Sequence, residues 1–204
     1  MSETMPACPT DHPPDAFPAA LITSFRFTKD LADRAIAQVP DARLHEALDP
    51  NTNSIAVIMQ HLAGNLRSRW TDVFETDGEK PWRDRDAEFV DGRLSREALC
   101  TAWEEGWACV LDTLATLTPA DVARSVRIRG EVLTFPQAAC RALAHAGYHV
   151  GQIVMIARVL AGETWTTLSI PRGESRSYNE RVWRDAGATG PAPDAETDAE
   201  TDPE

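Results

Sequence analysis

Long apolar runs are missing from the 204-residue sequence. No stretch approaches the roughly 18 uninterrupted apolar residues that would suggest a membrane-spanning helix. The first residues, MSETMPACPTDHPPDAFP, also lack the basic start and the apolar core of a signal peptide. We therefore expect a cytoplasmic protein that does not associate with membranes.

Cysteines are few and widely spaced, at positions Cys8, Cys100, Cys109 and Cys140. They form no CxxC pair and no dense framework, which argues against a zinc ribbon and against a disulfide scaffold. We expect thiols that take no part in structure or chemistry.

Basic residues are outnumbered, with 20 Lys and Arg against 32 Asp and Glu, so the formal net charge is −12. A protein that neutralises nucleic-acid phosphates needs a basic surplus on some face, so we expect no nucleic-acid partner. Seven of the acidic residues lie in residues 185–204, a stretch rich in Ala, Thr, Pro and Gly with no basic residue. Such a composition cannot bury enough apolar surface to fold, and it predicts a disordered acidic tail.

Prolines also mark the other end of the chain. Four of them in residues 1–17 predict a disordered N-terminal arm, because proline interrupts both helix and sheet. One domain is therefore expected over residues 18–184, and its 43% apolar composition is sufficient for a core.

Apolar residues recur at helical spacing in three segments of this domain. The first runs from Ala19 to Val39-Pro40, the second from a cap at Asn53 or Ser54 to Asp77-Gly78, and the third from a cap at Ser95 to Thr118-Pro119. The expected buried faces are Leu21, Ile22, Phe25, Phe27, Leu31, Ala32 and Ile36; Ile55, Ile58, Met59, Leu62, Leu66, Trp70 and Val73; and Leu99, Trp103, Trp107, Val110, Leu111 and Leu114.

A different pattern follows the third segment. Apolar and basic residues alternate on either side of Gly130-Glu131, which predicts a short β-hairpin near residues 125–134. Thr134, Pro136 and Gln137 then form a capping box with proline in the first turn, which predicts a fourth helix that ends near Ala161-Gly162. Four amphipathic helices and one small hairpin indicate an all-α protein built as a four-helix bundle.

Two histidines on the fourth helix suggest a metal site. His145 and His149 are four residues apart, so their Cβ atoms lie about 5–6 Å apart on one face and both rings can reach one ion. That face is expected to be buried, and its small residues would leave room beside an ion. It consists of Ala138, Ala142, His145, His149, Gln152, Ile156 and Leu160.

His61 lies in the middle of the second helix, beside its apolar stripe. A single histidine there is more often a hydrogen-bonded core residue than a ligand. Three buried histidines without a shared purpose would, however, leave several ring nitrogens in need of partners, at about 1–3 kcal/mol for each unsatisfied group. We therefore predict one divalent ion on His61, His145 and His149, and leave out His12 and His45, which lie in the predicted arm and in a loop.

These residues resemble the DinB/YfiT-like superfamily of metal-dependent four-helix bundles, and in particular an uncharacterised bacterial branch. The resemblance spans about Phe25 to Asn179 and rests on the histidine of the second helix, the histidine pair followed by Gly-Gln-Ile, and Leu-Ser-Ile-Pro. The segments that carry it are Asn53–Trp70, Thr76–Trp82, Arg85–Phe89, His145–Val154 and Trp165–Ser175. It implies up-down-down-up connectivity, zinc or nickel on the three histidines, frequent homodimers, and enzymes that use a low-molecular-weight thiol as cosubstrate.

Three protein nitrogens leave a coordination position open, as in catalytic sites. A thiol held there becomes a thiolate, which favours a thiol-dependent S-transferase or isomerase that acts on small electrophiles. Asn65, Arg69, Tyr148 and Gln152 are candidates to orient substrate or donate a proton, although core hydrogen bonds or an internal ion pair would also explain them. A non-catalytic metal- or ligand-binding protein and a hydrolase that uses metal-activated water stay open. The sequence lacks the HExxH glutamate of zinc peptidases.

Overall fold

The computed structural model describes residues 16–187. The chain divides into two compact units, and the boundary in the sequence lies between Thr166 and Thr167. The first unit contains helices α1 (Ala16–Ile36), α2 (Ile55–Trp70), α3 (Arg96–Ala115) and α5 (Phe135–Ala161), the single-turn helix α4 (Pro119–Val122), the strands β1 (Ser125–Ile128) and β2 (Glu131–Thr134), and the 3₁₀ turns η1 (Asp41–Arg43), η2 (Ala87–Phe89) and η3 (Gly162–Thr164).

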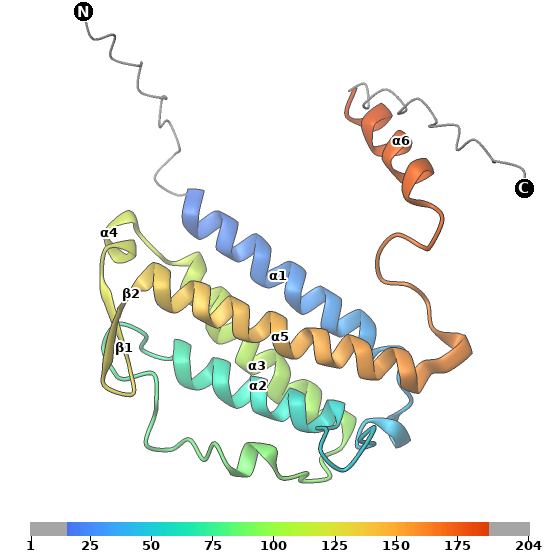
Figure 1. Cartoon of the computed structure of the whole chain (residues 1–204). Coiled ribbons are helices and arrows are strands. Elements are labelled where there is room, and N and C mark those ends of the chain that lie inside the picture. Colours follow the sequence, from blue (N-terminus) through green and yellow to red (C-terminus); the bar gives the residue numbers. More distant parts are fainter. Residues whose placement is uncertain (1–15, 188–204) are drawn as a thin grey trace, which may run out of the picture. The chain divides into compact units, whose positions relative to one another are not determined.

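The four long helices form the predicted all-α bundle. α1 and α5 run in one direction, while α2 and α3 run in the opposite direction (Figure 1). This is the up-down-down-up order, and it makes α1 and α5 parallel neighbours although 98 residues separate the end of one from the start of the other. None of the helices in the described part of the chain is long and apolar enough to cross a membrane.

The apolar stripes predicted from helical spacing form the core between these helices. All seven residues of the second stripe are buried, as are five of the six on α3. Phe27 is an exception, because its side chain is 68% exposed on the outer face of α1. Phe27 is two positions from Phe25, and residues at that spacing point to different sides of a helix.

Helix boundaries follow the predicted caps at most ends. Ser54 and Ser95 accept hydrogen bonds from the backbone three residues ahead. Thr134 and Gln137 make both bonds of the capping box, and Gly162 ends α5 with a positive φ. These side chains satisfy backbone groups that the helix itself leaves without partners.

Two predicted boundaries were wrong. α2 ends at Trp70 instead of near Asp77-Gly78, because Asp72 adopts a positive φ of 46° that no helix continues. Thr118 and Pro119 do not close α3 but begin α4.

The predicted hairpin is present as β1 and β2, which pair antiparallel from Ser125↔Thr134 to Ile128↔Glu131. Its turn is Arg129-Gly130, one residue earlier than expected. Both residues have positive φ, as a type I′ turn requires.

A close contact between α2 and α3 depends on Gly106. A Cβ atom at this position would lie 2.8 Å from the Cα atom of Ala63. Glycine therefore lets the two backbones approach.

The second unit contains α6 (Ser175–Asp185), which the sequence analysis did not predict. Its large apolar residues are Tyr178, Val182 and Trp183, too few to give a helical pattern. Apart from Ala16, Phe17 and residues 185–187, the predicted N-terminal arm and acidic tail lie outside the described residues.

Candidate metal centre

His61 lies buried in the middle of α2, with both ring nitrogens in defined contacts. Its Nδ1 atom is 2.9 Å from Oε2 of Glu88, to which the ring N–H donates a hydrogen bond. Phe89 stacks against the ring, with 4.4 Å between the centroids. The carboxylate thereby fixes the tautomer, because a proton on Nδ1 leaves a lone pair on Nε2.

His149 is held in the same way from within α5. Its Nδ1 lies 2.8 Å from Oε1 of Gln152, an amide oxygen that can only accept, so Nε2 again carries the lone pair. His145 lies one turn before His149, and the centroids of the two rings are 4.7 Å apart. The stripe predicted on this helix is buried in part: Ala138, His149, Ile156 and Leu160 are buried, while Ala142, His145 and Gln152 are half-buried.

The three rings meet at one point between α2 and α5. Nε2 of His61 is 3.3 Å from Nε2 of His145, and one ligand atom from each of the three residues lies within 4.8 Å of the others. Tetrahedral ligands at about 2.0–2.1 Å from zinc are about 3.3–3.4 Å apart. A proton can link two of these nitrogens, whereas one cation can accept all three lone pairs. The three histidines are therefore a cluster that can hold a metal ion.

The electrostatics keep the α5 histidines neutral. Burial lowers the pKa of His145 to about 4, with further contributions from His149, His61, Arg83 and Arg69. Burial also lowers the pKa of His149, against the opposing effect of the hydrogen bond to Gln152. A metal binds the neutral imidazole, so neither ring has to lose a proton to coordinate near neutral pH.

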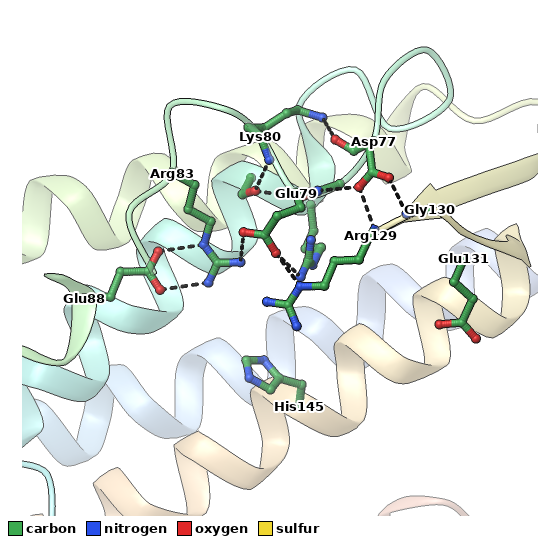
Figure 2. A network of polar contacts seen from close by, with 12 residues as sticks. Asp77, Glu79, Lys80, Arg83, Glu88, Arg129, Gly130, Glu131 and His145 are labelled. Atoms are coloured by element: carbon green, nitrogen blue, oxygen red, sulfur yellow. Dashed lines mark hydrogen bonds and ion pairs between the residues drawn. The ribbon is translucent and has the colours of Figure 1, made fainter. Parts of the chain in front are cut away.

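Glu88, in η2, holds the outer side of the centre. It accepts two hydrogen bonds from Arg83, at 2.7 and 2.8 Å, and both are drawn in Figure 2. Burial alone would raise the pKa of Glu88, but the hydrogen bonds from Arg83 and His61 outweigh burial and lower it. The carboxylate therefore stays ionised and accepts the hydrogen bond from the Nδ1–H group of His61.

Gly64 makes room for this carboxylate on the surface of α2. A Cβ atom at Gly64 would lie 2.3 Å from Oε1 of Glu88. Any larger residue would displace Glu88 from His61.

A cavity of about 180 Å³ opens beside His61 and His145. Its walls are largely apolar, and small alanines of α5 keep it open, as the sequence analysis expected. The uncharged lining residues are Asn65, Trp70, Val73, Val126, Ile128, Phe135, Ala138, Ala139 and Ala142, and the charged ones are Arg69, Arg85, Arg129 and Arg141.

The four further candidates occupy different places. Asn65 and Arg69 line the cavity, and Arg69 also pairs with Glu79 at 3.0 Å. Gln152 is the hydrogen-bond partner of His149. Tyr148 is exposed, with its ring against that of His149 at 4.9 Å between centroids, and it is not among the residues that line the cavity. No function has been tested for any of them, so their catalytic roles stay predictions.

Of the two excluded histidines, the one that the structure describes does not join the centre. His45 contacts Asp91 and the backbone of Leu94, and His12 lies outside the described residues. Sequence reasoning missed Glu88 and Arg83, which lie in a segment expected to be a loop. Loop residues have no periodicity to show which of them point inward, and the only signal was the place of Glu88 within Arg85–Phe89.

Residues 15–174 match a family described as "Protein of unknown function (DUF1572)". No curated protein and no solved structure matches the chain. The match covers most of the chain, including the three histidines, Glu88 and the whole lining of the cavity. The protein therefore belongs to the DUF1572 family.

Proposed function

We propose that the protein binds one divalent ion, zinc or nickel, through Nε2 of His61, His145 and His149. The observation that carries this proposal is the convergence of three imidazoles, two of which have their Nδ1 protons held by Glu88 and Gln152. Carboxylate and amide partners of this kind orient histidine ligands in known metal sites.

The composition of the centre favours catalysis over a structural role. Structural zinc sites usually have four protein ligands, often cysteines, whereas catalytic sites have three and keep one position open. Here the three described cysteines are not part of the cluster, and a cavity reaches two of the histidines. When bound, the ion would supply an open position at which a thiol is held as thiolate near neutral pH.

The surrounding side chains have separate roles in this proposal. The Asn65 carboxamide lines the cavity one turn beyond His61 and orients substrate by hydrogen bonds. Gln152 keeps His149 in its ligating tautomer. Arg69 contributes positive charge to the cavity wall, and Tyr148, next to His149, donates a proton from the solvent side.

We further propose that DUF1572 is a branch of the DinB/YfiT-like superfamily and that this chain is a thiol-dependent S-transferase or isomerase acting on small electrophiles. The bundle order, the three-histidine cluster and the cavity support this assignment. A homodimer is part of the same proposal.

Metal analysis of protein made without a histidine tag tests the premise. We expect about one zinc or nickel ion per chain in the wild type and in the control His45→Ala, and less than a tenth of that in His149→Ala. Equal metal content in wild type and His149→Ala, or no stoichiometric metal in either, would refute the site.

The reaction is tested separately, by mixing metal-loaded protein with several cellular thiols and a panel of electrophiles. Turnover that requires both a thiol and His149 is the expected result. Ester or amide cleavage without thiol would identify a hydrolase instead. A large loss of melting temperature on chelation, with no turnover in any mixture, would identify a non-catalytic binding protein.

A further inference from the structure

The charged part of the cavity lining has one sign. Arg69, Arg85, Arg129 and Arg141 reach it, and no carboxylate among residues 16–187 does. This is unexpected in a chain whose net charge is −12, because a random selection of its charged side chains would be mostly acidic. A charge distribution against the overall composition indicates a site that selects its ligand by charge.

One carboxylate behind the lining is shared by several arginines. Glu79 serves three guanidinium groups, at 3.0 Å from Arg69, 2.7 Å from Arg129 and 3.6 Å from Arg83. Figure 2 shows Glu79 between the side chains of Arg83 and Arg129. Glu88, the other partner of Arg83, is also bonded to His61.

The two outer arginines are weakly compensated as well. Arg141 meets Glu131 at 3.2 Å, where both side chains are exposed. The nearest carboxylate to Arg85 is that of Asp86, at 3.9 Å, and its guanidinium lies over the ring of Phe89. Exposed pairs of this kind contribute only about 0–1 kcal/mol, so a ligand can compete for these arginines.

Arg69, which lines the cavity, has a buried donor without a partner among the described residues. Its Nη2 donates to Glu79, but Nη1 is buried and has no hydrogen-bond partner among the described residues. Burial lowers the pKa of Arg69, and the neighbouring cations Arg83 and Arg129 lower it further against the effect of Glu79. A buried, unsatisfied N–H group is unfavourable, and an anion that reached this group would satisfy it.

We propose that the cavity binds a small organic anion: a carboxylate held by Arg69 and Arg129, on an apolar body that packs against Trp70 and Phe135. Typical ligand pockets have volumes of about 300–1,000 Å³, so a cavity of about 180 Å³ selects a small molecule. If the proposed function is right, this anion is the electrophilic substrate, and its reacting carbon lies toward His61 and His145; that part of the inference rests on the proposed function. The anion site itself requires no metal.

Calorimetric titration of metal-depleted protein tests the anion site with two isosteric pairs, benzoate against benzamide and isovalerate against isovaleramide. Removing the metal first prevents the carboxylate from binding to the ion itself. We expect at least one carboxylate to bind at least tenfold more tightly than its amide. If no carboxylate binds, or if both members of each pair bind equally, the inference is wrong.

Variants locate the binding. Arg69→Met should weaken carboxylate binding at least tenfold, while Arg67→Met, on the exposed side of the same helix turn, should leave it unchanged. If circular dichroism shows that Arg69→Met does not fold, Arg129→Met takes its place in the titration. The side chain of Arg129 is 52% exposed, so its removal leaves the core intact. Unchanged affinity in the folded variant would overturn the proposal.

The same samples separate this inference from the metal proposal. His149→Ala should lose metal and still prefer benzoate, because His149 does not line the cavity. Carboxylate preference without any metal in the wild type would leave the anion site standing and remove the metal proposal. Metal binding without carboxylate preference would support the metal proposal and refute the anion site.

Discussion

Replacing Glu88 by glutamine tests whether the carboxylate behind His61 tunes the metal centre. The substitution keeps the shape of the side chain and removes its charge. The carboxylate accepts three hydrogen bonds, one from His61 and two from Arg83, and its side chain is only 10% exposed. Oε2 accepts from His61 and from Nη2 of Arg83, and Oε1 accepts from Nε of Arg83. A glutamine has a single accepting oxygen, so in either orientation its NH₂ group faces at least one of these N–H donors.

The expected loss of metal affinity follows from the contact to His61. Partners that orient a histidine ligand typically account for a factor of about 10–100 in metal affinity, which corresponds to about 1.4–2.8 kcal/mol. Because the ligating nitrogens themselves are unchanged, Glu88→Gln should still bind one ion per chain.

The expected loss of stability follows from the contact to Arg83, whose side chain is 1% exposed. Removing one partner of a buried ion pair costs about 3–5 kcal/mol. We expect the lower end of this range, because Glu79 still lies 3.6 Å from the same guanidinium.

Competition against a chromophoric zinc chelator measures the affinity, and urea unfolding in the presence of EDTA measures the stability of the metal-free protein. Glu105→Gln is the control, since it makes the same change at an exposed position of α3. A Glu88→Gln protein with zinc affinity within twofold of wild type would refute the idea that Glu88 acts through His61.

Three further predictions address the same region and the packing of the bundle. Gly64→Ala should weaken zinc binding about tenfold in the chelator competition by displacing Glu88, and unchanged affinity would show that the carboxylate can move at no cost. Gly106→Ala should lower the free energy of unfolding by about 1–3 kcal/mol, because the new Cβ meets the backbone of α2. Gly147→Ala, with open space around it, should raise the free energy of unfolding by up to about 1 kcal/mol. Equal effects of the two substitutions in urea unfolding would contradict the contact at Gly106. In EDTA, the stability of the folded chain should fall as the pH drops from about 6.5 towards 4, because His145 takes up a proton in the unfolded chain before it does so in the folded one. The pH slope that this residue contributes is at most about 1.4 kcal/mol per pH unit. The variant His145→Asn should lack this contribution in urea unfolding.

The sequence by itself determined the four long helices, most of their buried faces and the placement of two of the three rings. Helical periodicity places His145 and His149 on one face of α5 wherever that helix packs, because four residues make about one turn. The caps at Ser54, Ser95 and Thr134 were equally local, since each involves residues only three positions apart.

Only the tertiary structure decided which other groups meet these two rings. His61 reaches His145 across 84 positions of sequence because α2 and α5 pack together. Glu88 comes from η2, Arg85 from the segment before it and Arg129 from the hairpin turn, where no helical periodicity fixes the inward direction. Gly64 matters only because a carboxylate from η2 occupies the space beside it. Local spacing thus specified the ligands on one helix, while long-range packing assembled the charge and the shape around them.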